Sequence, residues 1–375
     1  MSQKKLLFTP GPLSTSDTVK QAMLRDLGSR DREFLSVVRD IRRRLLELGG
    51  VANGSYEAVL MQGSGTFAVE SVLSSVIPST GKLLVAINGS YGHRMAKIAK
   101  VLGIACETVV FDEATPVLTS RVREALVAEP AITHVGTIHC ETSTGIVNPV
   151  AELGRAVRQS GRTFIVDGMS SFGGIPTDLG ADKIDFLISS ANKCIQGVPG
   201  FAFVLARRDL LEPAEGCARS VSLDLLAQSK GFASDGQFRF TPPTHALLAF
   251  AQALAELEEE GGVRGRAARY SANHKALIDG MTELGFDAYL APEHRSHIIT
   301  SFRFPGHRRF DFPTFYDRLS ESGFVIYPGK ASHADCFRIG TIGHIFPHDI
   351  EALVAAIGRA LAEMQVDSAH AVSYA

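Results

Sequence analysis

The sequence predicts an α/β fold: a mostly parallel, seven-stranded sheet flanked by helices, followed by a smaller C-terminal α+β domain. Between residues 57 and 209, strand-like apolar runs alternate with segments whose apolar residues recur at helical spacing. The strand cores, such as LLVAI and TFIV, are continuously apolar, which is typical of strands buried on both faces. The 375 residues are enough for two packed domains.

Two helices are expected before the first strand. The first covers residues 15–28 with Ser16 or Asp17 as its N-cap, because Ser and Asp side chains accept hydrogen bonds from free N–H groups. The second runs from residue 33 to a glycine pair at 49–50, a typical helix stop. The strands of the large sheet are expected at residues 57–63, 82–89, 106–112, 134–141, 163–168, 185–191 and 200–209. The helices between them are expected at residues 66–77, 92–103, 119–130 and 149–161.

After about residue 245 the pattern changes to long helices followed by short strands. We therefore expect a large domain over residues 16–262 and a small domain over residues 263–366, joined by the N-terminal segment 1–15. Residues 367–375 have no pattern and are expected to be a disordered tail. Helices are expected at residues 244–262, 263–285, 311–323 and 347–364, and strands at residues 298–305, 324–329 and 336–343.

Composition excludes several classes of function. Lys and Arg number 38 and Asp and Glu 40, so no basic excess indicates a nucleic-acid or membrane partner. The five cysteines are scattered without a CxxC pair, which supports neither a disulfide framework nor a zinc cluster and favours a reducing cytoplasm. The N-terminus does not have the pattern of a signal peptide, and no apolar run approaches the roughly 18 residues of a spanning helix.

The stretch MQGSGTFAVES joins the first predicted strand to a helix that begins near Thr66. Gly63 and Gly65 allow the backbone to approach a ligand closely, and the free N–H groups of a helix N-terminus attract anions. The hydroxyls of Ser64 and Thr66 add donors. The stretch therefore predicts either a phosphate site or a glycine-rich turn with a Ser/Thr cap, and it lacks the GK[ST] of a Walker loop.

Two more candidate residues follow strand ends. Tyr91, in NGSYGHR, could stack on a flat cofactor or be an ordinary loop tyrosine. Asp167 ends an apolar strand, so its carboxylate would be almost desolvated unless a protonated ring nitrogen, an arginine or a metal met it. No second carboxylate or histidine is spaced nearby for a metal site.

Lys193, in SSANKCIQGVPG, follows the strand after the one that ends at Asp167. Adjacent strand ends would bring the two residues to one rim of the sheet. A lysine in a partly apolar crevice has a lowered pKa, and its neutral amine can form a Schiff base; the alternative is a structural Lys–Asp ion pair. A phosphate site, an aromatic plate, a buried carboxylate and a buried amine together predict pyridoxal 5'-phosphate as the cofactor.

Arg338, in CFRIGTIG, lies on a predicted strand of the small domain. Its guanidinium could clamp a substrate carboxylate or phosphonate, or it could form a surface ion pair. The histidine pairs of HRSH and HIFPH have no clear acidic or cysteine partner, so we interpret them as loop histidines and expect no metal.

The order of PGP, GSGT, NGSYG, ETSTG, VDGMSS and SANKCIQGVPG resembles the class V aminotransferases of the fold-type I pyridoxal-phosphate enzymes. The stretches FTPPTHALLAFAQAL, GFVIYPGK and DCFRIGTIG are similar to the branch that transfers the amino group of 2-aminoethylphosphonate to pyruvate in phosphonate catabolism. The resemblance covers roughly residues 6–364. It implies a homodimer with active sites at the subunit interface, and phosphonoacetaldehyde and L-alanine as products.

The resemblance also implies a role for each matching residue. Lys193 and Asp167 would be catalytic: Lys193 forms the Schiff base and then moves protons, and Asp167 pairs with the pyridinium nitrogen. Tyr91 would stack on the ring, and Arg338 would bind the acid group of the substrate. The other implied contacts are Ser64, Gly65 and Thr66 to the phosphate, Thr142 to the side of the phenolic oxygen, Thr241 to the phosphate of the neighbouring subunit, and Ser14 as a second substrate contact. Asn192 either contacts the phosphate or caps the turn.

Two alternatives stay open from the sequence. The same scaffold could serve an alanine–glyoxylate or serine–pyruvate aminotransferase, and the amino donor distinguishes these from the phosphonate branch. A non-catalytic binding protein with the pyridoxal-phosphate fold is the second alternative, and absence of turnover would identify it.

Overall fold

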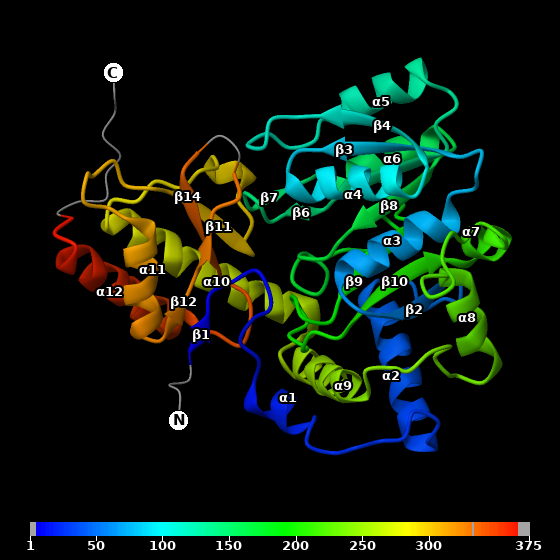
Figure 1. The fold of residues 1–375 in the computed structure, drawn as a ribbon, viewed down its shortest axis with the longest axis horizontal. Helices are drawn as coiled ribbons and strands as arrows, with labels where there is room; N and C mark the ends of the chain where they lie inside the picture. Colours follow the sequence, from blue (N-terminus) through cyan, green and yellow to red (C-terminus); the bar gives the residue numbers. More distant parts are fainter. Residues whose placement is uncertain (1–4, 332–333, 367–375) are drawn as a thin grey trace.

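The computed structural model describes residues 5–331 and 334–366, and a seven-stranded sheet forms its centre (Figure 1). The strands are Tyr56–Gln62 (β2), Lys82–Ile87 (β3), Ala105–Val110 (β4), His134–Ile138 (β5), Thr163–Asp167 (β8), Phe186–Ser190 (β9) and Phe201–Arg207 (β10). Their order is β2-β10-β9-β8-β5-β3-β4. The predicted mostly parallel sheet is confirmed.

Strand β10 is the one member of this sheet that runs against its neighbours, and it pairs antiparallel with both β9 and β2. The reason is local, because β9 and β10 are joined by the non-helical segment 191–200, which turns the chain back, instead of by a crossover helix. Gly200 in this segment has a φ of +151°, a conformation that side-chain-bearing residues rarely adopt. The remaining pairs, β3 with β4 and β5, and β8 with β5 and β9, are parallel.

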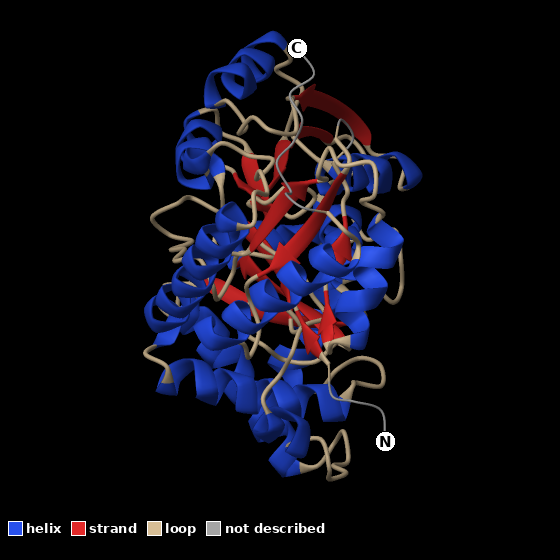
Figure 2. Ribbon diagram, turned by 90° about the vertical axis from the view of Figure 1, so that its left-hand side faces the viewer, coloured by secondary structure: helices blue, strands red, loops and turns tan. Residues whose placement is uncertain are grey.

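Helices lie on both sides of the sheet (Figure 2). They are Arg32–Leu48 (α2), Gly65–Val76 (α3), Ser90–Val101 (α4), Thr119–Ala128 (α5), Val150–Gln159 (α6), Leu225–Ser234 (α8) and Thr244–Glu259 (α9). Their apolar faces and the strands form the largest hydrophobic core. Every residue from Phe201 to Ala206 of β10 is fully buried, which explains the continuous apolar runs of the sequence.

A smaller antiparallel sheet has the order β11-β14-β13 and a hydrophobic core of its own. Its elements and neighbours are Ile299–Arg303 (β11), Tyr327–Pro328 (β13), Cys336–Gly340 (β14), Gly262–Glu283 (α10), Phe312–Glu321 (α11) and Pro347–Glu363 (α12). The strand Leu6–Leu7 (β1) pairs in parallel with Phe324–Val325 (β12), so the N-terminal segment lies against the C-terminal part (Figure 1). The predicted domain boundary after residue 262 stays a prediction, which these two cores support.

Several elements differ from the predictions. The first helix, Asp17–Gln21 (α1), is much shorter than expected and uses Ser16 as its N-cap. Helix α4 begins two residues before its predicted start, so Tyr91 lies in its first turn and not in a loop. The chain also has elements that we did not predict: Arg208–Leu211 (α7), Glu212–Ala214 (η1), Pro292–His294 (η2), Ile146–Val147 (β7) and helix α8. The strand predicted at residues 134–141 is divided into β5 and Cys140–Glu141 (β6).

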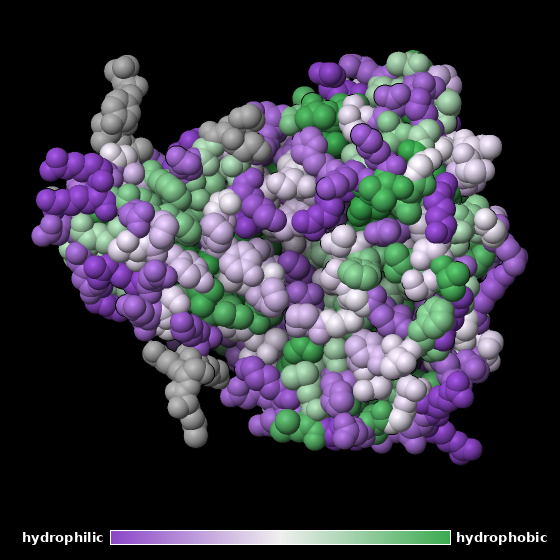
Figure 3. Space-filling model, viewed as in Figure 1, coloured by the Kyte–Doolittle hydropathy of each residue, from purple (hydrophilic) through white to green (hydrophobic). Residues whose placement is uncertain are grey.

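The tail that we predicted to be disordered, residues 367–375, lies outside the described residues. Within the described part of the chain, no helix is both long and apolar enough to cross a membrane. Hydrophobic side chains interrupt the polar surface over the large sheet and its helices on the face drawn in Figure 3.

Candidate active site

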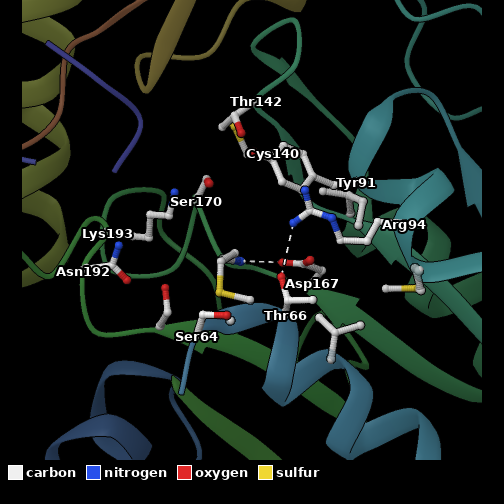
Figure 4. Close-up of a pocket in the computed structure, with 16 residues that line it drawn as sticks. Ser64, Thr66, Tyr91, Arg94, Cys140, Thr142, Asp167, Ser170, Asn192 and Lys193 are labelled. Atoms are coloured by element: carbon white, nitrogen blue, oxygen red, sulfur yellow. Dashed lines mark hydrogen bonds between the residues drawn. The ribbon is translucent and has the colours of Figure 1, made fainter. Parts of the chain in front are cut away.

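The carboxyl ends of strands β2, β3, β5, β8 and β9 surround one cavity, drawn in Figure 4. This is the edge at which open α/β sheets bind ligands. The structure brings most of the predicted site residues into its lining: Ser64, Gly65, Thr66, Tyr91, Thr142, Asp167, Asn192 and Lys193.

Lys193 follows β9 and points its amine at the N-terminal segment. Its Nζ donates a hydrogen bond of 2.7 Å to the carbonyl of Pro10. A Cβ atom on Gly11 would lie 2.7 Å from Lys193 Cδ, and Gly11 has a φ of +121°, so only glycine fits there without strain. Burial lowers the pKa of Lys193, which favours the neutral, nucleophilic amine.

Asp167 is the last residue of β8 and is 7% exposed. The backbone N–H of Met169 donates to its Oδ1 at 2.9 Å (Figure 4), and no ion pair of Asp167 exists among the described residues. Burial raises the pKa of its carboxyl to about 6. The carboxylate is therefore placed to meet a cation, because none of the described residues forms an ion pair with it.

The N-terminus of α3 faces the same cavity. Ser64 is its N-cap residue, but the Ser64 hydroxyl makes no capping hydrogen bond. The side chains of Ser16, Asp31, Asp224 and Asp311, by contrast, do cap their helices. The hydroxyl of Ser64 and the first free N–H groups of α3 thus remain available for an anion.

Tyr91 is positioned by a buried acid. The carboxylate of Glu141, which is fully buried, accepts hydrogen bonds from the backbone N–H groups of Tyr91 at 3.0 Å and Gly92 at 3.3 Å, and from Ser143 Oγ at 2.8 Å. Burial raises the pKa of Glu141 despite these donors. Sequence reasoning missed Glu141, although a glutamate directly after a buried strand needs such donors.

Arg338 is not among the residues that line the cavity, but its guanidinium lies beside Tyr91, which does line it. It is 3% exposed, and it donates to the backbone carbonyls of Pro328 at 2.9 Å and Thr142 at 2.7 Å. The Tyr91 phenol lies beside the Thr142 hydroxyl and the Arg338 guanidinium. Burial would raise the pKa of this phenol, but the positive charges of Lys193 and Lys330 and the contact with Thr142 lower it.

Besides Arg338, two predicted residues lie outside the cavity lining of this chain. Thr241 is exposed in the loop before α9, where its carbonyl accepts a hydrogen bond from Gln62 Nε2 at 3.4 Å. Ser14 lines a separate hollow beside α12, and its Oγ accepts from the backbone N–H of Leu7 at 2.9 Å. Neither Thr241 nor Ser14 lines the cavity, so among the described residues of one chain neither would contact a ligand bound there.

Other lining residues had not been predicted. Arg94 follows Tyr91 by one helical turn, places its guanidinium 4.7 Å from the Tyr91 ring centroid and donates to Thr66 Oγ1 at 3.2 Å (Figure 4). Its position could have been found from helical spacing if α4 had been predicted to begin before Tyr91. The others include Cys140, Met169 and Ser170, which lie on loops and strand ends without a sequence signal.

Residues 16–334 match the family model described as Aminotransferase class-V. The chain is 56% identical over 352 residues to a 2-aminoethylphosphonate–pyruvate transaminase of Syntrophobacter fumaroxidans, an alignment that covers 94% of this chain and 95% of that protein. It is 52% identical to the protein of the same name from Vibrio cholerae, with 96% and 99% covered.

Solved structures show the same fold at lower identity. Pyridoxamine–pyruvate aminotransferase from Mesorhizobium loti superimposes with a TM-score of 0.89 at 23% identity, covering 98% of this chain and 95% of that one. Ureidoglycine–glyoxylate aminotransferase from Bacillus subtilis has a TM-score of 0.88 at 22% identity, covering 98% of each chain. Sequence and fold agree, and the chain belongs to the class-V aminotransferase family.

Proposed function

We propose that this protein is a pyridoxal-phosphate-dependent transaminase that moves the amino group of 2-aminoethylphosphonate to pyruvate. Phosphonoacetaldehyde and L-alanine are the products. Eight curated relatives with 48–56% identity carry the name of this activity, and their alignments cover at least 94% of the chain. The observation that carries the proposal is the cavity in which Lys193, Asp167 and the N-terminus of α3 meet.

The residues of the cavity fit pyridoxal phosphate. The Ser64 hydroxyl has no capping partner, the buried Asp167 carboxylate has no ion pair among the described residues, and the pKa of the Lys193 amine is lowered by burial. Ser64, Gly65 and Thr66 would hold the phosphate, Tyr91 and Thr142 would face the ring, and Asn192 would lie beside Lys193. When bound, the cofactor supplies a carbonyl that condenses with amines and a ring that accepts electrons.

Lys193 is the residue that moves protons in this proposal. Its Nζ, whose pKa burial lowers, removes a proton from the amine-bearing carbon of the donor and later returns one. The Pro10 carbonyl orients this amine by accepting its hydrogen bond. Asp167 would pair with the ring nitrogen of the cofactor, because a cation beside the carboxylate would lower the pKa of the carboxyl from about 6.

Arg338 would hold the acid group of the substrate in both half-reactions. Carboxylate and phosphonate both present oxygens that a guanidinium can bind with two hydrogen bonds. The backbone carbonyls of Pro328 and Thr142 fix the plane of the guanidinium before the substrate arrives. We also propose Ser14 as a second substrate contact. Because Ser14 lines a separate hollow, this contact would require the N-terminal segment to rearrange.

A homodimer with active sites at the subunit interface is part of the proposal. Because Thr241 is exposed and lies away from the cavity, its proposed contact with the phosphate requires a second copy of the chain. Phe67 and Phe240, 52% and 45% exposed, offer apolar surface for such a contact. We also propose a cytoplasmic location.

An amino-donor screen tests the proposed function. The purified protein is loaded with pyridoxal phosphate and given pyruvate with 2-aminoethylphosphonate, and alanine is measured, with Lys193→Ala as the inactive control. Alanine formation from the phosphonate is expected. Alanine formed from serine but not from the phosphonate would refute the substrate, and no turnover with any donor would refute the enzyme.

A further inference from the structure

Lys330 brings an additional positive charge to Tyr91, one of the residues that line the cavity. Its Nζ lies 5.1 Å from the centroid of the Tyr91 ring, and Tyr91 lines the cavity together with Lys193. The charge of Lys330 acts on the Tyr91 phenol, as do those of Lys193 and Arg338. Together with Arg94, which lies one helical turn after Tyr91, four basic side chains therefore surround one tyrosine, and three of them come from distant parts of the sequence.

The pairing of β13 with β14 holds Lys330 near Arg338. Tyr327 lies opposite Arg338 in the ladder, and the backbone N–H of Gly329 donates to the Cys336 carbonyl at 2.9 Å. A Cβ atom on Gly329 would lie 2.2 Å from that carbonyl oxygen, so the two backbones approach more closely than any side chain allows. The segment that carries Lys330 is thus tied to the strand that carries Arg338.

Neither cation has an acidic partner within residues 5–331 and 334–366. Arg338 donates to the two backbone carbonyls, and Lys330 is exposed and lies over the Tyr91 ring. The buried acid closest to Tyr91, Glu141, accepts its hydrogen bonds from Tyr91, Gly92 and Ser143. Two positive charges beside the cavity therefore remain available to an anionic ligand.

We propose that Lys330 determines specificity for a dianionic acid group: it pairs with the second negative charge of the phosphonate while Arg338 holds the first. This inference rests on the function proposed above. A carboxylate carries one charge, whereas a phosphonate, like a phosphate monoester, carries close to two at about pH 8. The contact of an exposed lysine with an aromatic ring is weaker than a charge-assisted hydrogen bond, so Lys330 can leave Tyr91 for the phosphonate.

The two half-reactions of the cofactor-loaded enzyme test this role, because one uses the phosphonate and the other the carboxylate of pyruvate. In stopped-flow absorbance measurements at pH 8, Lys330→Met should lower kcat/KM for 2-aminoethylphosphonate roughly tenfold. The kcat/KM for pyruvate should change less than about twofold, because Arg338 alone matches one charge. An equal loss in both half-reactions, or no loss in either, would overturn the proposal.

Two variants serve as controls. Lys330→Arg should keep most of the preference for the phosphonate, because it preserves the charge. Lys100→Met removes the same charge from an exposed lysine in the last turn of α4 and should change neither half-reaction. A loss of phosphonate turnover in Lys100→Met equal to that in Lys330→Met would mean that overall charge, and not Lys330, is responsible.

A sulfonate separates charge from shape. 2-Aminoethylsulfonate has the tetrahedral acid group of the substrate with a single charge, so its inhibition constant should be the same for wild type and Lys330→Met. If Lys330→Met weakened inhibition by the sulfonate tenfold, the proposed role of Lys330 in recognising the second charge of the phosphonate would be overturned. If the wild type uses another donor but not the phosphonate, the proposed function fails; if it uses the phosphonate and Lys330→Met does so equally well, only the role of Lys330 fails.

Discussion

Replacing Asp167 with asparagine should stabilise the cofactor-free protein while damaging its activity. Asp167 is 7% exposed, and burial raises the pKa of its carboxyl from 3.8 to about 6. This rise corresponds to about 3 kcal/mol against folding when the carboxyl is ionised. An asparagine oxygen can still accept the hydrogen bond from Met169, so the substitution removes the charge and keeps the contact. We expect a gain in the free energy of unfolding of up to about 3 kcal/mol at pH 7.5.

The gain should depend on pH in a defined direction. The pKa of Asp167 is higher in the folded protein than in the unfolded chain. The ionised carboxylate therefore does not destabilise the folded wild type below about pH 4, destabilises it increasingly between about pH 4 and 6, and destabilises it fully above that. The wild type therefore loses stability relative to Asp167→Asn as the pH rises through this window. The two proteins should be almost equally stable near pH 4 and differ most at pH 7 and above.

Urea unfolding of the cofactor-free proteins between pH 4 and 8, at one protein concentration, measures this difference. Asp235→Asn is a matched control, because Asp235 is exposed and its Oδ1 accepts from the backbone N–H two residues later, Gln237, at 3.0 Å. It should leave stability almost unchanged. Equal stability of Asp167→Asn and wild type at pH 7, or a difference that does not vary with pH, would refute the reasoning. With cofactor bound, Asp167→Asn should lose roughly a hundredfold in turnover, because the ring nitrogen loses its partner.

Four further substitutions test the site, and one of them, Ser16→Ala, is a control outside the cavity lining. Lys193→Ala should abolish transamination and the visible absorption of the bound cofactor while retaining the fold by circular dichroism; turnover in this variant would contradict the role of the amine. Ser64→Ala should weaken cofactor binding about tenfold by titration with little loss of stability, because the hydroxyl makes no capping bond. Ser16→Ala should lose about 1 kcal/mol of stability without affecting cofactor binding, because Ser16 Oγ accepts from Val19 at 3.1 Å, and the reverse pattern would show that we have misassigned the two serines. Gly11→Ala should cost about 1–3 kcal/mol and reduce cofactor affinity, since the added Cβ would lie 2.7 Å from Lys193 Cδ; unchanged affinity would mean that the N-terminal segment does not position the amine.

The large sheet could be predicted because its signals are local. Each strand is an apolar run and each crossover a periodic helix, so the alternation alone indicates a parallel sheet. Asp167 and Lys193 stand directly after successive strands, and β8 and β9 are neighbours in the sheet, so both side chains line one cavity. The anion site proposed at the start of α3 also rests on a local pattern, the glycines and hydroxyls around a strand–helix junction.

Boundaries and exceptions were less predictable. Helix α1 ends at Gln21 although the sequence pattern continues, and α4 begins at Ser90 because the buried Glu141 carboxylate accepts hydrogen bonds from the first turn. That acid belongs to a different strand, about 50 residues away along the chain. Helix propensity within the segment therefore could not indicate where α4 starts.

The sequence by itself determined the sheet, predicted the rim at which polar residues gather, and singled out Lys193 and Asp167, whose catalytic roles stay a prediction. Only the tertiary structure placed the Pro10 carbonyl and Gly11 against Lys193, and Arg338 and Lys330 beside Tyr91. These contacts join residues that are between about 180 and 250 positions apart. They arise because β1 pairs with β12 and β13 with β14, which brings the N-terminal segment and the small sheet to the mouth of the cavity, and no periodicity along the chain encodes such pairings.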